Sequence, residues 1–484
     1  MAVFLCIDIG TSRVKTALID DRGSMIAERS RRLDRASSPD FQNAEEWYAI
    51  TAELIRDLPA SPKPDAISLT GNMHALLPID KDGIPLMDAE LWCSNRAASE
   101  SDLLNRRYAG EFLKRFGNVS TPVFSLPKIL KLKQDQPDLY RKTVAFLQVK
   151  DYIALRLTGK LTTEPTDATG TLLCRLDTHE WDQDMITELG LKQTCFPEIR
   201  PSASICGKVT PAAAAETGLD TGLPVVAGAG DLSSAALGSG TGPGTLSLTL
   251  GTAGQLLAAG PRGSYPLLAG KLFAFAHADP TEDLFLGSVP GGGFTFEWLS
   301  KNMFHCTLDQ FFSMADRAEL QEDLPLFMPY LLGRGAPYMD YTPCAKWCRL
   351  SAHHNSDQLA LGAVTGTLSA LCQSAVLLEK LLNCRYRNVV LQSLAYRENA
   401  VRKTAAALFR QQKSLPVNPE ASLLGAAVIA AVATGSADSF HDAQTKMVHT
   451  KRLPDVPEVL KETASRLFAA YMAEADIIAG QLKN

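Results

Sequence analysis

The start of the chain alternates between short apolar runs and turns of small or polar residues. Residues 3–7 and 14–19 are apolar runs rich in residues that favour strands, and residues 25–29 follow after a second turn. The pattern predicts a β-meander. The tip of its first hairpin carries the small residues Gly10, Thr11 and Ser12.

A helical pattern follows the meander. Large apolar residues recur at helical spacing between residues 45 and 58, and the prolines within residues 59–64 end the helix. Residues 66–70 have the pattern of a buried strand, which leads into the segment 71–74. The mixture of strands and helices indicates an α/β fold.

The hairpin pattern recurs in the second half of the chain. Residues 244–259 have the pattern of a strand, a small-residue tip and a second strand. The two tips lie 241 residues apart, about half of the chain, which favours a duplicated architecture. The glycine-rich stretch 238–244 is the natural boundary, so we predict two α/β domains, residues 1–243 and 244–484.

Length and composition agree with this division. At roughly 150 residues per domain, a chain of 484 residues has two or three domains. The chain is 46% hydrophobic and 21% charged, which is typical of a globular protein. A net charge of -5 and a pI near 6.0 argue against a nucleic-acid partner, because such proteins usually carry a basic face.

The sequence shows no signal for export or membrane insertion. The N-terminus has no basic segment, and Asp8 interrupts the first apolar run too early for a signal peptide. The longest apolar stretch, residues 423–433, is too short to span a bilayer. We therefore expect a cytoplasmic protein with no membrane partner, whose ten cysteines are thiols. A homodimer is compatible with the sequence.

The two hairpin tips have the chemistry of anion sites. Gly10 and Gly251 let the backbone approach an oxyanion, and Thr11, Ser12 and Thr252 add hydroxyl donors. Two such tips facing each other across a cleft can hold the polyphosphate of a nucleotide. Ordinary hairpin turns use the same residue types, so this alternative stays open for each tip taken alone.

Two acids stand at the ends of predicted strands. Asp8 ends the first strand, and Asp231 follows a strand at residues 223–227. Magnesium binds one or two carboxylates together with phosphate oxygens, and a sugar hydroxyl needs an acceptor for its proton as it attacks phosphorus. Asp8 and Asp231 supply the minimal set for both roles. The alternative for Asp231 is a cap on a helix that begins near Ser233.

Together these motifs resemble the FGGY family of carbohydrate kinases, within the superfamily that includes actin, sugar kinases and chaperones. The resemblance runs over most of the chain in the family's order. It comprises Asp8-Ile9-Gly10-Thr11-Ser12 with Val14-Lys15, Gly71-Asn72-Met73-His74, Trp92 with Arg96, Pro127-Lys128, Lys150-Asp151-Tyr152, Asp167-Ala168-Thr169-Gly170-Thr171, Gly230-Asp231, Leu250-Gly251-Thr252, Phe327-Met328-Pro329-Tyr330 and Leu424-Gly425-Ala426-Ala427.

The resemblance implies two RNase-H-like domains with a cleft between them, and ATP-dependent phosphorylation of a sugar with Mg2+. Asp231 matches the family's general base, and Asp8 and Asp231 are the predicted metal ligands. The predicted nucleotide-binding residues are Gly10, Thr11, Ser12, Gly251, Thr252, Gln255, Gly292, Leu394 and Ala395. The predicted sugar-binding residues are Met73, His74, Trp92, Arg96 and Asp231. Strand-end packing is the alternative for Met73 and His74.

The sugar side departs from the family in two places. Cys93 and Ser94 follow Trp92 where xylulose kinases have an amide and an acid, so D-xylulose should not be the best substrate. The segment 290–293 roughly echoes a glycine segment of sedoheptulose kinases. Either an anion at helix N–H groups or a positive φ would explain its glycines.

The adenine side departs further. Glycines that let the purine lie against bare backbone in the family are replaced here by Gln392, Ser393 and Leu394. Side chains at these positions should occlude the usual base position or force a new one. We therefore predict weak discrimination among nucleoside triphosphates.

These observations predict a two-domain kinase that phosphorylates a ketose or a related polyol with MgATP. The competing hypothesis is a non-catalytic sugar-binding or regulatory protein with a degenerate nucleotide site. An actin-like or chaperone-like ATPase has less support, because it would not need Met73 and His74, and no peptide-binding domain follows.

Overall fold

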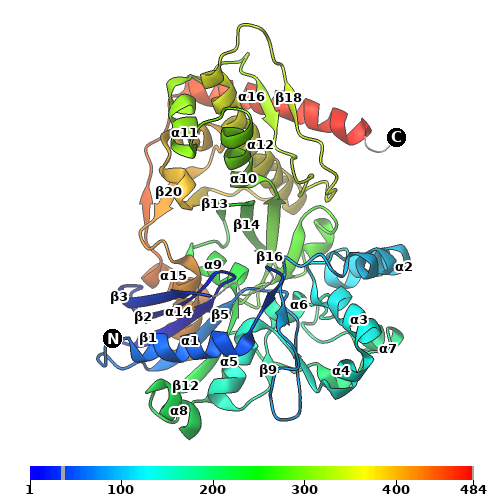
Figure 1. Cartoon of the computed structure of the whole chain (residues 1–484). Helices are drawn as coiled ribbons and strands as arrows, with labels where there is room; N and C mark the ends of the chain where they lie inside the picture. The colour runs from blue at the N-terminus through cyan, green and yellow to red at the C-terminus, as the bar shows by residue number, and fades with distance from the viewer. Residues whose placement is uncertain (34–38, 482–484) are drawn as a thin grey trace.

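A computed structural model describes residues 1–33 and 39–481. Two lobes lie one above the other, and each is built around one mixed sheet (Figure 1). The six strands of the first sheet lie in the order β11 (Ile205–Lys208), β12 (Pro224–Gly230), β5 (Ala66–Gly71), β1 (Val3–Ile9), β2 (Arg13–Asp20) and β3 (Met25–Arg32). The seven strands of the second sheet lie in the order β15 (Phe273–Ala276), β16 (Glu282–Val289), β14 (Gly254–Pro261), β13 (Thr245–Leu250), β19 (Asn388–Gln392), β20 (Gln412–Pro416) and β21 (Thr450–Arg452).

The two sheets repeat one arrangement. In the first sheet, β2 pairs antiparallel with β1 and with β3, and β5 and β12 continue the sheet in parallel on the other side of β1. In the second sheet, β14 and β16 repeat the antiparallel side and β19 and β20 the parallel side around β13. The duplicated architecture predicted from the two hairpins is confirmed.

Helices cover both sheets. The first half of the chain contributes α1 (Ala44–Arg56), α2 (Ala98–Phe116), α3 (Ser125–Asp135), α4 (Pro137–Lys142), α5 (Val149–Thr158), α6 (Pro165–Thr169), α7 (Gln183–Glu188), α8 (Pro211–Thr217) and α9 (Asp231–Gly238). The second half contributes α10 (Gly292–Asn302), α11 (Leu308–Arg317), α12 (Ser356–Leu382), α13 (Asn399–Leu408), α14 (Ala421–Ala433), α15 (Phe440–Met447) and α16 (Glu458–Gln481). Short two-stranded ribbons join β4 (Phe41–Gln42) to β7 (Ala89–Glu90), β6 (Leu77–Ile79) to β8 (Ala145–Leu147), β9 (Thr162–Thr163) to β10 (Glu198–Ile199), and β17 (Leu326–Met328) to β18 (Lys346–Cys348).

The halves of the chain are interleaved in space. The helices α14 and α15, coloured orange, lie beside the blue strands of the first sheet (Figure 1), and one core cluster joins α14 residues such as Ile429 to Phe4 and Ile19. In the opposite direction, Phe112 and Phe124 from the first half share a cluster with Phe275 of β15. The boundary between residues 243 and 244 stays a prediction, since segments of each half pack on the sheet of the other.

The contact between α9 and α14 depends on two glycines. A Cβ atom on Gly425 of α14 would lie 1.8 Å from the carbonyl oxygen of Ser234 in α9. A Cβ atom on Gly238 would lie 1.9 Å from the carbonyl oxygen of Ala421. Distances this short leave no room for a methyl group, so the two helix backbones touch.

Among the described residues, one helix is long and apolar enough to cross a membrane. This helix is α12, with a mean hydropathy of 1.6 in its most apolar stretch, 89% of which is buried inside the protein. Its residues Leu368 and Leu371 belong to the main core of the second lobe, which is typical of a core helix.

Candidate active site

The first hairpin tip is braced by two side chains. The turn between β1 and β2 is closed by the Gly10 N–H, which donates to the Arg13 carbonyl at 3.0 Å. The Gln42 amide donates to the Thr11 carbonyl at 2.6 Å, and the Trp92 indole N–H donates to the Thr11 hydroxyl at 3.0 Å. Within the described residues, the backbone N–H groups of Thr11 and Ser12 have no acceptor. They are therefore available to an anion.

The second hairpin tip is braced by the start of a helix. The first turn of α10 donates from the Gly293 N–H to the Gly251 carbonyl at 2.7 Å and from the Phe294 N–H to the Thr252 carbonyl at 3.1 Å. A Cβ atom on Gly292 would lie 2.0 Å from the backbone nitrogen of Gly254. The explanation by a positive φ is wrong, because the φ angles of these glycines are not positive. Two of the helix N–H groups bind the hairpin, and an anion at the remaining N–H groups stays a prediction.

Asp8 and Asp231 approach each other from β1 and from α9. Burial raises the pKa of Asp8 to about 6, against the charge of Lys15, which lies directly opposite Asp8 in the β1–β2 register. Burial, and then the charge of Asp8, raise the pKa of Asp231 to about 7. The predicted capping role of Asp231 is wrong, because α9 begins at Asp231 itself and its N-cap is Gly230.

A buried polar network fixes the residue that precedes Asp231. The Gly230 N–H donates to the Thr166 hydroxyl at 2.8 Å, and that hydroxyl donates to Glu164 at 2.6 Å. The ammonium of Lys150 lies 3.3 Å from Glu164, and also pairs with Asp151 and Asp167. These charged side chains are buried, so displacing any of them leaves a buried charge unpaired.

Met73 and His74 lie at the end of β5 beside Asp231. A Cβ atom on Gly230 would lie 2.5 Å from the Met73 side chain, so these two residues touch. His74 is buried, packs edge-on against Phe124 and lies 5.4 Å from the Phe275 ring of the second sheet. Met73 and His74 thus occupy the junction of the lobes.

The tautomer of His74 follows from its one fixed partner. Burial lowers the pKa of His74 to about 4, so the ring is neutral near pH 7. Its Nδ1 lies 2.8 Å from the Gly170 carbonyl, which can only accept, so Nδ1 carries the proton. Nε2 is then an acceptor, suited to a hydroxyl and not to a carbonyl.

The described polar and ring contacts of Trp92 and Arg96 do not involve His74. Trp92 is 43% exposed and donates a hydrogen bond to Thr11 of the first hairpin tip. Arg96 pairs with Glu90 at 3.5 Å and lies over the Phe41 ring at 5.0 Å. The sequence predicts that Trp92 binds the sugar. Its described hydrogen bond goes instead to Thr11, on the tip that is predicted to bind phosphate.

The segment 392–395, which is predicted to lie near the adenine base, differs from a turn made of glycines. Gln392 ends β19, and its side-chain amide donates to the Ser247 hydroxyl at 2.9 Å. Ser393 has a φ of 113°, and Ala395 packs partly buried against the core of the second lobe. The backbone at Leu394 begins a short 3-10 helix, but its side chain lies outside the described residues, so its predicted intrusion is not tested. Gln255 lies near the start of β14, opposite Thr249.

Two lysines near the site were missed by the sequence analysis as functional residues. Lys15 pairs with Glu420, which immediately precedes α14, so this ion pair joins segments 405 residues apart. Lys128 is buried, donates to the His74 carbonyl at 2.7 Å, and has a pKa that burial lowers to about 7. The hairpin register could have placed Lys15 beside Asp8, whereas no local pattern points to Glu420.

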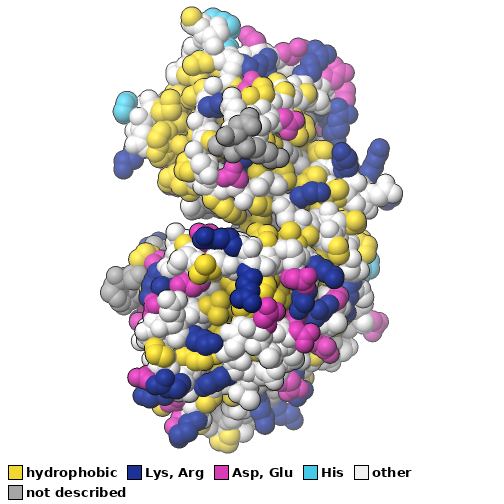
Figure 2. Space-filling model, turned by 90° about the vertical axis from the view of Figure 1, so that its right-hand side faces the viewer, with side chains coloured by type: hydrophobic (Ala, Val, Ile, Leu, Met, Phe, Trp, Pro, Cys, Tyr) yellow, Lys and Arg dark blue, Asp and Glu magenta, His cyan; other side chains and the backbone are white. Residues whose placement is uncertain are grey.

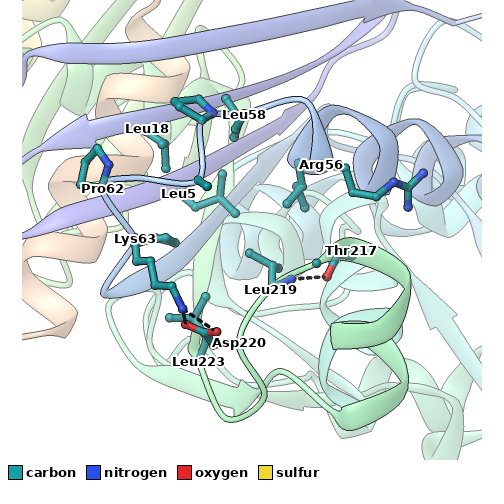
Figure 3. A pocket seen from close by; sticks show the side chains of 15 residues that line it. Leu5, Leu18, Arg56, Leu58, Pro62, Lys63, Thr217, Leu219, Asp220 and Leu223 are labelled. Carbon is teal, nitrogen blue, oxygen red and sulfur yellow. Dashed lines mark hydrogen bonds and ion pairs between the residues drawn. The ribbon is translucent and has the colours of Figure 1, made fainter.

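The surface narrows to a waist between the lobes (Figure 2). A separate cavity of about 280 Å³ lies in the first lobe, where Leu5, Leu18 and Leu223 meet the Lys63–Asp220 ion pair (Figure 3). None of the candidate site residues lines this cavity. It is therefore not the predicted site.

Comparison with known proteins decides the family. Residues 3–238 match the N-terminal domain of the FGGY family of carbohydrate kinases. The xylulose kinase of Bacillus subtilis (strain 168) is 27% identical over 458 residues, which cover 93% of this chain and 91% of that protein. The chain belongs to the FGGY family of carbohydrate kinases. The gluconokinase of Bacillus licheniformis is also similar, with 25% identity over 95% of this FGGY chain and 93% of the relative.

Solved structures of similar fold agree with the two-lobed architecture. The ligand-bound xylulose kinase from Lactobacillus acidophilus covers 99% of both chains, with a TM-score of 0.90 and 24% identity. The gluconate kinase from the same organism matches equally well, with a TM-score of 0.90 and 24% identity over 99% of both chains. These structures confirm the predicted fold. The family match and the curated relatives show that the protein is a sugar kinase.

Proposed function

We propose that this kinase transfers the γ-phosphoryl group of ATP to a hydroxyl of a ketose or a related polyol, with Asp231 as the general base. The observation that carries the proposal is the raised pKa of Asp231, about 7, beside Asp8 at the mouth of the first sheet. A general base works best when its pKa lies near the working pH, because it is then deprotonated and still basic.

The geometry supports a simple division of tasks. Asp231 accepts the hydroxyl proton as the sugar oxygen attacks phosphorus. The backbone N–H groups and hydroxyls at Thr11 and Thr252 bind phosphate oxygens from opposite lobes. Closure of the lobes excludes water, which would otherwise compete with the sugar for the phosphoryl group.

Asp8 and Asp231 suit a divalent cation. Burial raises the pKa of both carboxylates, and the charge of Asp8 raises the pKa of Asp231 further. Lys15, opposite Asp8, is paired with Glu420. Carboxylates of this kind hold Mg2+ together with phosphate oxygens and water. Bound Mg2+ would neutralise the charge that develops on the transferred phosphoryl group.

On the sugar side, we assign Met73 and His74 to the substrate. His74 accepts a hydrogen bond from a sugar hydroxyl at Nε2, and the ring is held by Gly170 and Phe124. Replacing His74 with Ala should weaken sugar affinity by about 1–3 kcal/mol, because the hydroxyl loses a buried partner. Nucleotide affinity should not change, and an equal loss for both ligands would indicate misfolding instead.

A substrate panel tests the proposal. ATP consumption is measured with ketoses, aldoses and polyols, together with gluconate and D-xylulose because relatives carry those names. We expect turnover of a ketose or polyol other than D-xylulose. No turnover with any sugar, combined with a thermal shift by sugar but none by nucleotide, would favour the competing hypothesis of a non-catalytic sugar-binding protein. The same assay with GTP in place of ATP tests the predicted weak nucleotide discrimination.

The remaining predictions concern partners and location. A cytoplasmic location, the absence of nucleic-acid and membrane partners, and a homodimer stay predictions from the sequence. Light scattering of the purified protein measures the oligomeric state directly.

A further inference from the structure

Ser393 has a backbone conformation that is almost confined to glycine. Its φ is 113° and its ψ is 157°, at the turn where β19 ends and the short helix η3 (Leu394–Arg397) begins. A residue with a Cβ atom is strained in this region, and such strain persists only where surrounding interactions hold it. The interactions that hold Ser393 therefore indicate what the strain serves.

The hydroxyl of Ser393 binds both backbone groups of one residue in the neighbouring strand. The Leu250 N–H donates to the Ser393 hydroxyl at 3.3 Å, and that hydroxyl donates to the Leu250 carbonyl at 3.1 Å. The last residue pair of the β13–β19 ladder is Thr249 with Gln392. The side chain of Ser393 thus extends the ladder by one residue beyond the point where the backbones separate.

Leu250 is the residue that immediately precedes the second hairpin tip. The tip itself, Gly251 and Thr252, is held from its other side by the N–H groups of Gly293 and Phe294. The tip is therefore held on two sides, by Ser393 after the end of β19 and by the first turn of α10. Without Ser393, the β13 end of the tip loses its contacts to β19 at Leu250.

We propose that Ser393 is a positioning residue for the phosphates of the nucleotide, acting through Leu250 on the tip at Gly251 and Thr252. The inference rests on the proposed function, because it requires that this tip binds phosphate. A glycine at position 393 would remove the strain but could not bind Leu250. This chain therefore keeps a strained serine at a turn that also borders the expected base position, and phosphate binding depends on the bonds of that serine to Leu250.

Two variants separate the strain from the hydrogen bonds. Ser393→Ala keeps the strain and loses both bonds, whereas Ser393→Gly loses the bonds and relieves the strain. Affinities for ADP, tripolyphosphate and adenosine are measured by calorimetry, and Tm is measured without ligand. We expect both variants to bind ADP and tripolyphosphate about three- to tenfold more weakly, the range for one lost hydrogen-bonding group. Adenosine affinity should not fall in either variant, and Tm should be higher for Ser393→Gly than for Ser393→Ala.

Gln392→Ala is the matched control, because it removes the neighbouring bond to Ser247 and leaves Leu250 untouched. It should bind tripolyphosphate as the native protein does. Native-like tripolyphosphate affinity in Ser393→Ala would overturn the inference alone, as would an equal loss in Gln392→Ala. A native protein that binds neither ADP nor tripolyphosphate would overturn the proposed function together with the inference.

Discussion

The two hairpin tips have the same fold and different chemistry. In the first hairpin, Asp8 lies opposite Lys15, two residues before the glycine of the tip. At the matching place in the second hairpin, two residues before Gly251, Thr249 lies opposite Gln255. One hairpin therefore carries a charged pair and the other a neutral pair, although both stand at the centre of duplicated sheets.

The residues that hold the two hairpin tips in place also differ. The first tip is braced by the side chains of Gln42 and Trp92, whereas the second is braced by backbone N–H groups of α10 and, at Leu250, by the Ser393 hydroxyl. Asp231 also belongs to the first lobe. The comparison indicates that duplication supplied two similar hairpin frames, and that the two acids proposed for metal binding and proton transfer both lie in the first lobe.

The largest expected effect is the loss of the base in the first lobe. Asp231→Asn keeps the shape of the side chain but cannot accept a proton. We expect kcat to fall by roughly 10²–10⁴, the usual range for removal of a general base, with sugar affinity largely kept. Steady-state kinetics and sugar calorimetry measure the two quantities. A near-native kcat would remove Asp231 from this role.

The comparison between hairpins is tested by replacing matched positions. Asp8→Asn should lower activity or Mg2+ affinity by about 10–100-fold, as for other residues that hold or orient a metal. Thr249→Val, its counterpart in the second hairpin, removes a hydroxyl without removing charge and should change Mg2+ dependence little. Mg2+ titrations of activity and of thermal stability check both variants. Equal Mg2+ dependence in the two variants would break the proposed division between the lobes.

The third prediction concerns the helix contact that joins the second half of the chain to Asp231. Gly425→Ala places a methyl group against the Ser234 carbonyl of α9, the helix that begins with Asp231. We expect a loss of about 1–3 kcal/mol in the free energy of unfolding, the usual cost of overpacking, and a lower kcat. Denaturant unfolding measures the first quantity.

Gly480→Ala is the control for this helix contact. Gly480 lies in α16, where an added Cβ atom would meet nothing within 4 Å. Because Ala favours a helix over Gly by about 1 kcal/mol, this variant should be as stable as the native protein or more stable. Native-like stability of Gly425→Ala would show that the α9–α14 contact tolerates a methyl group, and equal destabilisation by both variants would show that the loss does not come from this contact.

The smallest expected effect is a shift in pH dependence. The pKa of Asp231 is raised to about 7, so kcat/KM for the sugar should rise with pH through this value as the base loses its proton. Burial lowers the pKa of His74 to about 4, so this ring should not contribute. Because the charge of Asp8 raises the pKa of Asp231, Asp8→Asn should move this limb to lower pH. If the rise in kcat/KM stays at the same pH in Asp8→Asn, the titrating group is not Asp231 but another group, such as Lys128, whose pKa is about 7.

The local parts of this molecule were predictable and the long-range parts were not. Alternation and turn residues identified both hairpins, and the helix predicted over residues 45–58 is α1, capped by the side chain of Asn43. The residues that determine these elements are neighbours in the sequence, so the elements can be predicted from the sequence alone.

What sequence reasoning missed depends on contacts between distant segments. The packing of α14 on the first sheet requires Gly238 and Gly425 to meet, and each glycine alone is an ordinary residue of a helix. The same holds for Glu420 beside Lys15. For the adenine segment, the loss of glycines was visible, but the strained turn at Ser393 and its bonds to Leu250 required the fold.

The interleaving of the two halves has a consequence for how the chain can fold during synthesis. Domains of many proteins fold one after another as they leave the ribosome. Here the face of the first sheet formed by Phe4, Ile19 and Val226 is covered by α14 and α15, which are made after the second sheet is nearly complete. This face of the first sheet therefore cannot be buried until residue 447 has emerged, whereas the core on its other face consists of residues 3–227 alone. A fragment that ends at residue 243 would keep that apolar face open to solvent and to other nascent chains.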